Sequence, residues 1–330
     1  MKKVLIIGNG AFGVAMSQIL LSNKNCEVFM FSKNAETGQE LLNGRHLLFP
    51  DKSLIPPHAV YSDYDKAFNN DINVIVLCVP SIAINDIFKQ IKPYLNTKMI
   101  IVNTAKGLNP HNQEMWSKLF LQDKLVHDYC LMVGPSFASE LVEQNKTIVN
   151  LVGNNYETIK EIEKLFNNDY FKLVYFADEY VASLVSSFKN SLAVGLGLLS
   201  VYCSSINTQA AYLIIGINEV QNLVSKLSNC GEIKILDFFG LGDIYLTCTS
   251  DESRNYQYGI KIGKDGVQNA NEELNSSTVE GYRTLKLIKE YLDKYKIKSV
   301  FFKTLYEICY EGRNPDTFVE YIWTHFKDSN

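Results

Sequence analysis

The sequence predicts an α/β protein in two domains: a doubly wound, mostly parallel sheet at residues 1–180, then an all-helical domain at residues 181–330. Short β-branched runs alternate with amphipathic segments in the first half, which is the pattern of a parallel sheet covered by helices. After about Asp178, strand signals become few and long apolar helical segments take over. A chain of 330 residues is long enough for two separate cores.

Seven β-branched runs are the expected strands of the first domain. They are Val4–Ile7, Val28–Phe31, Val74–Val79, Met99–Val102, Cys130–Val133, Ile148–Val152 and Lys172–Phe176. The segments between them with helical spacing of apolar residues are Phe12–Ser22, Ile82–Ile91, Gln113–Phe120 and Tyr156–Phe166. Asn43–Asp63 is expected to be a long ordered loop and Lys264–Ser277 an exposed connection. Ser191–Ile206 is expected to be a buried helix, because it is short and rich in Ser and Gly for a membrane span.

Composition and charge narrow the class of protein. The chain is 46% hydrophobic and 21% charged, as in ordinary globular proteins, and its net charge is -4. We therefore expect no nucleic-acid partner and no stable membrane insertion, and any anion site must be a local group of lysines and arginines. The seven cysteines form no C-x-x-C pair and the five histidines have no ligand spacing, so we expect reduced thiols, a cytoplasmic location and no metal.

A glycine motif follows the first expected strand. Gly8, Gly10 and Gly13 form G-x-G-x-x-G between that strand and a helix. The first glycine allows a tight turn, the second lets the backbone approach a pyrophosphate, and the third lets the helix pack on the strand. The helix N-terminus adds free N–H donors for the phosphates. This context favours dinucleotide binding over the alternative, a glycine turn in an unrelated α/β fold.

The second expected strand ends in Ser32 and Lys33, where NAD-selective sites usually carry an acidic residue for the ribose 2′-hydroxyl. A hydroxyl and an ammonium would not repel a 2′-phosphate. The cofactor is therefore NAD or NADP. Lys33 taken alone can also be an ordinary surface lysine.

Two loops follow neighbouring expected strands. Lys106 lies in the segment that follows Met99–Val102, and Gly134 and Ser136 come after Cys130–Val133. Open α/β sheets bind ligands at the carboxyl ends of their strands. Each loop alone could be a simple turn, but the pair favours a ligand crevice.

Lys189 and Asn190 lie inside an apolar helical run. Burying an ammonium costs several kcal/mol unless it is paired or has a chemical role. We expect Lys189 to exchange a proton with a carbonyl/hydroxyl pair. The alternative is a lysine whose stem is buried while its amine extends to solvent.

A dense polar stretch runs from Gly240 to Asn255. If it is one helix, its side chains at three- or four-residue steps share a face, and they are Asp243, Thr247, Ser250 and Arg254. Arg254 supplies a forked donor for phosphate, and Asp243 accepts from a hydroxyl. The remaining hydrogen bonds fall to Thr247, Ser253 and Asn255. The alternative is a capped surface helix.

Taken together, the chain resembles the bacterial-type NAD(P)-dependent glycerol-3-phosphate dehydrogenases over almost its whole length. The motifs that carry the resemblance are Gly8–Gly13, Cys78–Ser81, Lys106–Leu108, Gly134–Ala138, Lys189–Asn190, Gly240–Ile244, Ser253–Asn255 and Val279–Gly281. It implies a Rossmann-type domain followed by an all-helical domain similar to the C-terminal domain of 6-phosphogluconate dehydrogenase. It also implies interconversion of sn-glycerol 3-phosphate and dihydroxyacetone phosphate, supplying phospholipid synthesis, and we expect a homodimer.

The resemblance also implies roles for single residues. Lys189 matches the catalytic acid/base and Lys106 a substrate-orienting lysine that approaches the cofactor. Substrate positions are Gly134, Ser136, Asn190, Asp243, Thr247, Ser253, Arg254 and Asn255. Cofactor positions are Gly8, Gly10, Ala11, Phe12, Gly13, Ser32, Lys33, Lys106, Ala138, Arg254, Thr278 and Glu280.

The chain departs from the family pattern at Ile215, which stands where the family typically has an arginine. Two other functions stay open, and this departure motivates the second of them. One is a related two-domain reductase of another small hydroxy or keto acid, and the other is a dinucleotide-binding sensor without catalysis. Lys106 and Lys189 argue against the sensor, since it has no need of two ammonium groups.

Overall fold

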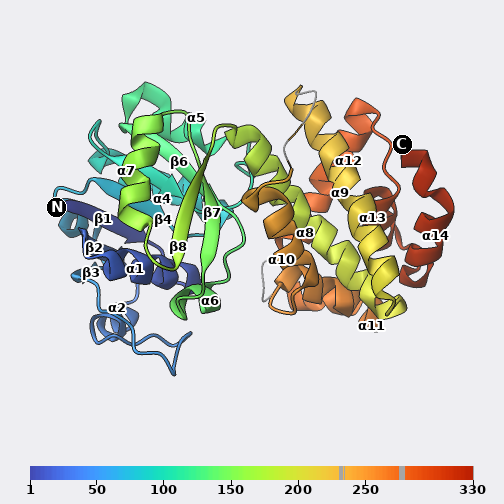
Figure 1. Cartoon of the computed structure of the whole chain (residues 1–330), viewed down its shortest axis with the longest axis horizontal. Coiled ribbons are helices and arrows are strands. Elements are labelled where there is room, and N and C mark those ends of the chain that lie inside the picture. The colour runs from blue at the N-terminus through green and yellow to red at the C-terminus, as the bar shows by residue number, and fades with distance from the viewer. Residues whose placement is uncertain (230–232, 234, 275–278, 330) are drawn as a thin grey trace. The chain divides into compact units, whose positions relative to one another are not determined.

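The computed structural model describes residues 1–229, 233, 235–274 and 279–329. The chain divides into two compact units, Met1–Tyr180 and Val181–Asn330 (Figure 1). The first unit is built on a sheet. The described part of the second consists of helices and their connections.

A single eight-stranded sheet forms the centre of the N-terminal unit, in the order β3-β2-β1-β4-β5-β6-β7-β8. The strands are β1 (Lys2–Ile7), β2 (Cys26–Phe31), β3 (Ala59–Tyr61), β4 (Val74–Leu77), β5 (Ile100–Asn103), β6 (Asp128–Val133), β7 (Thr147–Val152) and β8 (Phe171–Phe176). The strands from β3 to β6 in this order are parallel, whereas β7 is antiparallel to β6 and parallel to β8. The strand order reverses between β1 and β4, the switch point where such sheets bind ligands.

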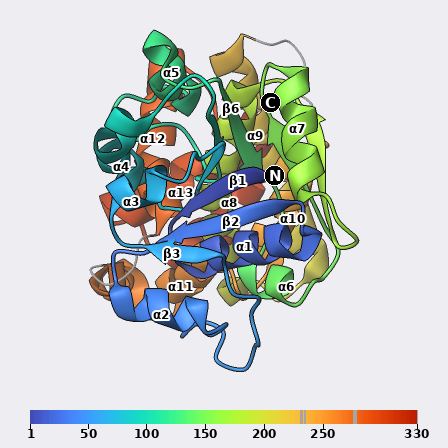
Figure 2. The same cartoon turned by 90° about the vertical axis from the view of Figure 1, so that its left-hand side faces the viewer.

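Helices cover both faces of this sheet, which confirms the doubly wound α/β prediction (Figure 2). One face carries α1 (Ala11–Asn23), α6 (Ala138–Val142) and α7 (Tyr156–Phe166), and the other α3 (Tyr64–Phe68), α4 (Ile84–Ile91) and α5 (Trp116–Leu121). All seven expected strands and the four expected helices are present; Tyr156–Phe166 has the expected ends, and the others are shifted at one end or both. Strands covered on both sides are mostly apolar, as in the buried run Val4–Ile7.

The expected loop Asn43–Asp63 is correct except that β3 lies near its end, paired with β2 over three residues. A strand this short gives no period-two signal in the sequence. The loop is fixed to α1 by Gln18, whose Nε2 donates to the Ile55 carbonyl at 3.0 Å and whose Oε1 accepts from the Ile55 N–H at 2.7 Å. Preceding the loop, α2 (Ala35–Leu42) is capped by Asn34, which accepts from Glu36 and Thr37 N–H groups.

The C-terminal unit contains a bundle of helices. They are α8 (Glu179–Tyr202), α9 (Ile206–Ser228), α10 (Asp243–Thr249), α11 (Arg254–Leu274), α12 (Glu280–Tyr295), α13 (Phe301–Glu311) and α14 (Phe318–His325), with a π-helical turn at Phe238–Gly242. Among the described residues, α8 is the one helix long and apolar enough to cross a bilayer. Of its most apolar 18-residue stretch, 83% is buried inside the protein. That burial is typical of the central helix of a globular domain.

Two expectations for this unit need correction. The expected connection Lys264–Ser277 is wrong up to Leu274, because α11 continues to that residue with one break at Gly266, where φ is 80°. Burial of Ile262 and Ala270 outweighs the weak helix propensity of the Asn- and Gly-rich segment. Residues 275–277 lie outside the described part. The expected helix Ser191–Ile206 ends early, at Tyr202, and Ile206 instead begins α9.

Glycines let α8 and α11 approach closely. A Cβ added at Gly197 of α8 would lie 2.0 Å from the Tyr256 carbonyl oxygen, and one at Gly259 of α11 would lie 2.0 Å from the Val194 carbonyl oxygen. Both obstructions are backbone atoms, so the helices themselves would have to separate. The contact therefore fixes α11 relative to α8 within this unit.

We predict that Gly197→Ala lowers the free energy of unfolding by about 2–3 kcal/mol, because overpacking at a backbone contact exceeds the gain in helix propensity. The matched control is Gly216→Ala in α9, whose Cβ would meet Cδ1 of Leu192, the movable end of a side chain. Chemical denaturation measures both. Equal effects of the two substitutions would contradict the close α8–α11 contact.

Candidate active site

The glycine motif forms a closely packed turn at the carboxyl end of β1. Gly8 has φ of +118°, and a Cβ there would lie 2.3 Å from the Cys78 carbonyl oxygen, in the loop after β4. A Cβ at Gly13 would lie 1.9 Å from the Gly8 carbonyl oxygen, whereas one at Gly10 would meet nothing within 4 Å. Gly10 is the N-cap of α1 and gives no side-chain cap. The space beside Gly10 at the N-terminus of α1 is therefore open, which fits a pyrophosphate.

A hydrogen-bond chain fixes this turn to the end of β2. Asn9 Nδ2 donates to Ser32 Oγ at 2.9 Å, and Ser32 Oγ donates to the Asn34 carbonyl at 2.7 Å. A ring nitrogen of His46 lies 2.9 Å from the Asn9 carbonyl oxygen. Ser32 is buried and structurally engaged, whereas Lys33 is exposed at the strand end.

Asn9 and His46 were missed by sequence reasoning. Asn9 is a variable position inside the glycine motif, so the motif itself gives no reason to select it. The His46 contact joins residues 37 positions apart through an irregular loop, and no periodic signal predicts such a contact.

The loops after β5 and β6 lie at the same edge of the sheet, because these neighbouring strands are parallel. Asn103 Oδ1 accepts from the Ala105 N–H at 3.0 Å, and Trp116 Nε1 donates to the Gly107 carbonyl at 3.1 Å. These bonds fix both sides of half-buried Lys106. Trp116, buried in α5, is a positioning residue that the sequence did not reveal.

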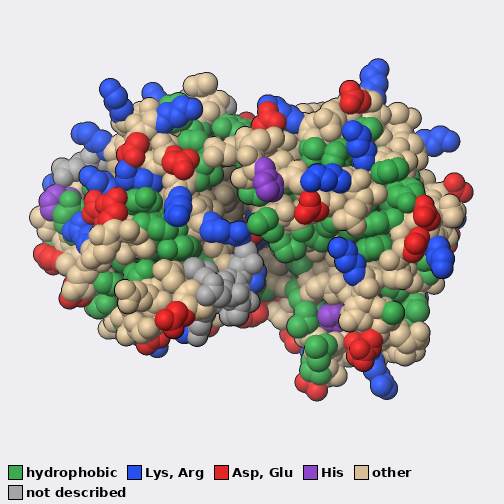
Figure 3. Space-filling view, turned by 180° about the vertical axis from the view of Figure 1, so that it is seen from behind, with side chains coloured by type: hydrophobic (Ala, Val, Ile, Leu, Met, Phe, Trp, Pro, Cys, Tyr) green, Lys and Arg blue, Asp and Glu red, His purple; other side chains and the backbone are tan. Residues whose placement is uncertain are grey.

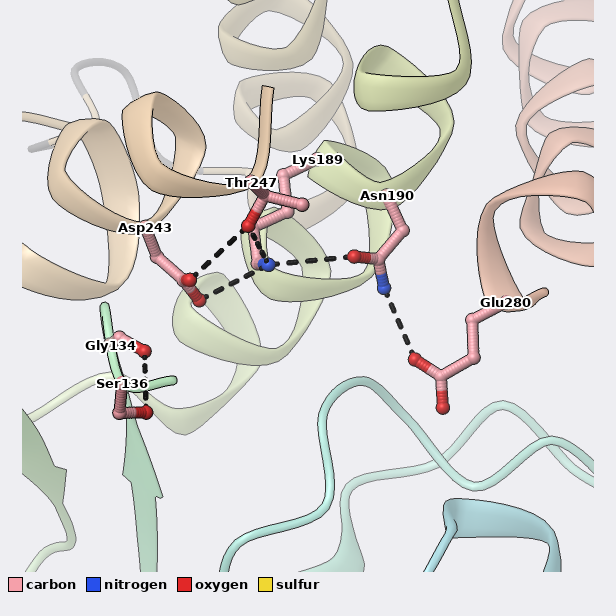
Figure 4. Close-up of polar contacts among 7 residues, drawn as sticks. All are labelled: Gly134, Ser136, Lys189, Asn190, Asp243, Thr247 and Glu280. Atoms are coloured by element: carbon pink, nitrogen blue, oxygen red, sulfur yellow. Dashed lines mark hydrogen bonds and ion pairs between the residues drawn. The ribbon is translucent and has the colours of Figure 1, made fainter. Parts of the chain in front are cut away.

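The loop after β6 contacts the start of α1. Ser136 Oγ donates to the Gly134 carbonyl at 3.1 Å, as Figure 4 shows. Phe12 and Ser136 line the same small void. Phe12, its neighbour Ala11 and Ala138, the first residue of α6, are partly buried against the core of this face. The expected cofactor and substrate loops of this unit are therefore contiguous.

In the C-terminal unit, Lys189 is the centre of a buried polar cluster (Figure 4). The Lys189 side chain is 1% exposed and its Nζ lies 3.2 Å from Oδ2 of Asp243, which is 0% exposed. The ammonium donates to Thr247 Oγ1 at 2.9 Å and to Asn190 Oδ1 at 3.4 Å. Because the amine ends on buried partners, the alternative of a lysine extending to solvent is wrong.

Asp243 and Thr247 are one turn apart on α10, and Thr247 Oγ1 also lies 3.4 Å from Asp243 Oδ1. The neighbouring Cys248 has a thiol pKa raised far above its usual value by burial, although Lys189 acts in the opposite direction. The thiol therefore stays neutral. Asp243 supplies the carboxylate that compensates the Lys189 charge.

The expected single face of Asp243, Thr247, Ser250 and Arg254 is wrong. Helix α10 ends at Thr249, Ser250 is extended, and a separate helix begins at Arg254. Ser250 Oγ instead accepts from the Glu252 N–H at 3.2 Å within the turn. Short polar side chains favour such turns over a continuous helix.

The residues that follow this turn have different environments. Ser253 is buried and its Oγ accepts from the Tyr256 N–H at 3.3 Å, while the Arg254 side chain is exposed. Asn255 Oδ1 accepts from the Gly281 N–H at 2.9 Å. Arg254 is therefore the member of this group with its charged end in solvent.

The start of α12 is tied to α8. Asn190 Nδ2 donates to Glu280 Oε2 at 3.2 Å (Figure 4), and Ser191 Oγ donates to the Gly281 carbonyl at 2.7 Å. A Cβ at Gly281 would lie 2.3 Å from the Asn190 carbonyl oxygen. Ser191 was not expected, since a serine in an apolar helix gives no sign of its partner. Thr278, an expected cofactor residue, lies outside the described residues.

A Rossmann-type sheet with a glycine cradle, together with a helical unit that buries a lysine–carboxylate pair, defines the class of two-domain NAD(P)-dependent oxidoreductases. Among the described residues, no cluster of three or more His, Cys, Asp or Glu side chains is arranged to hold a metal. Family models identify the chain within this class. The N-terminal and C-terminal models of NAD-dependent glycerol-3-phosphate dehydrogenase match residues 3–159 and 178–320, so the chain belongs to this family.

Relatives with curated names support the same assignment. Glycerol-3-phosphate dehydrogenase [NAD(P)+] of Malacoplasma penetrans is 30% identical over 97% of both chains. The enzyme of the same name from Mycoplasma mobile is 31% identical over 97% of this chain and 96% of its own. The resemblance inferred from sequence motifs is therefore confirmed.

Solved structures show how widely the fold is shared. The glycerol-3-phosphate dehydrogenase of Coxiella burnetii superposes with a TM-score of 0.84 at 24% identity, covering 98% of each chain. A D-mandelate dehydrogenase superposes with a TM-score of 0.57 at 14% identity, covering 96% of this chain and 99% of its own. At these identities both comparisons show the fold alone.

We predict that Lys189 and Asp243 are energetically coupled. Asp243→Asn and Lys189→Met should each lower the free energy of unfolding by about 3 kcal/mol, because each leaves one buried charge uncompensated. The double variant should lose clearly less than the sum. Urea denaturation of the four chains measures the coupling, and additive losses would show that the two charges do not stabilise each other.

Proposed function

We propose that this chain interconverts dihydroxyacetone phosphate and sn-glycerol 3-phosphate by reversible hydride transfer with NAD or NADP. The observation that carries the proposal is the buried Lys189 ammonium, held by Asp243 and Thr247. An ammonium placed in this way can stabilise negative charge on a carbonyl oxygen and deliver a proton to it.

The residues of the glycine turn fit the phosphates of a dinucleotide, and the cofactor-binding set comprises Gly8, Gly10, Ala11, Phe12, Gly13, Ser32, Lys33, Lys106, Ala138, Arg254 and Glu280. The bound nicotinamide supplies or accepts the hydride. Ser32 acts by fixing the turn through Asn9. Lys33, which is exposed at the strand end, would donate to the oxygen of a 2′-hydroxyl or to a 2′-phosphate.

Lys189 is the acid/base of the reaction. In the reducing direction its ammonium donates a proton to the C2 oxygen, and in the oxidising direction the neutral amine takes that proton back. Asp243 stabilises the charged form and holds Nζ in place, and Thr247 accepts one of its hydrogens. Asn190 Oδ1 lies 3.4 Å from Nζ, the longest of the three contacts, so it is the partner that the C2 oxygen would replace. Lys106 orients the substrate.

The phosphate end of the substrate is assigned to Arg254. Its exposed guanidinium can form two parallel hydrogen bonds to phosphate oxygens. Asn255 already uses Oδ1 on Gly281, so its Nδ2 group is the donor that it can offer. Ser253 acts as the cap that starts α11, and Gly134 and Ser136 contribute from the loop after β6.

We further propose a cytoplasmic homodimer that supplies glycerol 3-phosphate for phospholipid synthesis, without inserting into a membrane or binding nucleic acid. The net charge of -4 gives no general attraction to anionic polymers.

The direct test is oxidation of NADH and NADPH by the purified chain with dihydroxyacetone phosphate or with unphosphorylated dihydroxyacetone. We expect turnover with the phosphate and little with the unphosphorylated ketone. Arg254→Ala should lower kcat/KM for the phosphate on the order of hundredfold, because two charge-assisted hydrogen bonds are lost. Arg283→Ala, at an exposed arginine of α12, is the matched control.

Cofactor binding without turnover of either ketone would show a sensor rather than an enzyme. Equal turnover of both ketones, or an Arg254→Ala variant that behaves like the control, would contradict the assigned phosphate site.

A further inference from the structure

A cavity of about 550 Å³ lies in the C-terminal unit. Its described lining comes from the last turns of α12, the connection to α13, the first turn of α13 and the end of α14. None of the residues around Lys189 lines it. Its size falls within the range of about 300–1,000 Å³ that small-molecule sites occupy.

The lining of the cavity is strongly basic. Lys289, Lys296, Lys298 and Lys303 belong to it, together with His325. Among the described lining residues one carboxylate is present, Asp293, and it forms an ion pair with Lys289 at 2.5 Å. On the face drawn in Figure 3, Lys and Arg side chains are interspersed with Asp and Glu. The chain as a whole has a net charge of -4. The cavity therefore concentrates positive charge on a chain that is negative overall.

The N-terminus of α13, beside this cavity, already binds a carboxylate of the protein, that of Glu219. Buried Glu219 accepts from the N–H groups of Val300, Phe301 and Phe302 at 2.8, 3.0 and 3.2 Å, and from the Ser299 hydroxyl. These backbone donors are therefore occupied. An anion in the cavity would be bound by the lysine side chains. Each lysine carries a compact charge on a flexible stem, so several can reach the oxygens of one phosphate group.

Apart from Ser299 and Thr304, the remaining lining is apolar or aromatic. Half-buried Ile297 contributes most of the aliphatic surface, beside the largely buried Leu292 and Val300, and the rings of Tyr321 and His325 stack with centroids 4.2 Å apart. A bare inorganic ion would leave this surface uncovered. A ligand that matches the whole cavity combines an anionic group with an apolar or aromatic part.

We propose that this cavity is a second ligand site, separate from the active site, for a phosphate ester that carries an apolar group. Such a phosphate ester can be a free metabolite or the headgroup of an anionic phospholipid. The site lies at the C-terminal end of α12, whose 16 residues span about 24 Å. The other end of that helix carries Glu280 and Gly281, which contact Asn190 and Asn255.

The test uses the full chain with Arg254→Ala, so that the proposed substrate phosphate site is weakened. Equilibrium dialysis measures binding of phenyl phosphate and inorganic phosphate, and co-sedimentation measures binding to phosphatidylcholine vesicles with and without phosphatidylglycerol. Lys298→Glu with Lys303→Glu is the site variant. Lys226→Glu with Lys264→Glu, two exposed lysines of α9 and α11, is the control with the same change in charge.

We expect the site variant to weaken phenyl phosphate binding at least about tenfold while the control does not, with inorganic phosphate bound more weakly than phenyl phosphate. Loss confined to phosphatidylglycerol vesicles would identify the lipid headgroup as the source. Binding by the site variant equal to the control for every probe, or no binding by any chain, would overturn the proposal. Two measurements verify that the site variant folds. One is circular dichroism, and the other is turnover of dihydroxyacetone phosphate when the two lysine substitutions are made in the parental chain. If the proposed function is wrong, the parental chain will not turn over dihydroxyacetone phosphate, and the binding comparisons will not be affected.

Discussion

The buried ion pair between Lys189 and Asp243 is the interaction on which the C-terminal unit depends. Both side chains are almost fully inaccessible, so each charge is tolerated because the other is present. The pair requires α8 and α10 to stay in register, and Thr247 and Asn190 complete the hydrogen bonds of the ammonium. The same constraint that stabilises this part of the bundle therefore places a proton donor at a fixed point.

Close backbone approach recurs beside expected site residues in each of the two units. In the sheet unit, Gly8 and Gly13 bring β1, the loop after β4 and α1 together. In the helical unit, Gly197 and Gly259 join α8 to α11, and Gly281 places the start of α12 against the Asn190 backbone. At all these positions a methyl group would collide with main-chain atoms. Main-chain packing thus fixes the glycine turn and the starts of α11 and α12, whereas side-chain hydrogen bonds fix the loop of Lys106.

Much of the fold follows from the sequence because buried parallel strands and amphipathic helices have strong periodic signals. The glycine motif and the order of motifs that led to Lys106, Lys189 and Arg254 are similarly local. Contacts that form through tertiary packing could not be predicted from the sequence. The Asn9–His46 contact and the hydrogen bond from Trp116 to Gly107 produce no periodic pattern of residues. The prediction of a single helical face through Asp243 and Arg254 was wrong because residue spacing alone cannot show that a polar turn interrupts a helix.

The pH dependence of kcat/KM for dihydroxyacetone phosphate reduction, measured for the parent and for Lys189→Arg, tests the central claim that Lys189 exchanges the proton. The parent should lose activity as pH rises and the ammonium deprotonates. Arginine keeps its proton throughout this range, so the residual activity of the variant should lack that alkaline fall. An unchanged pH profile in Lys189→Arg would contradict the assignment of Lys189 as the acid/base.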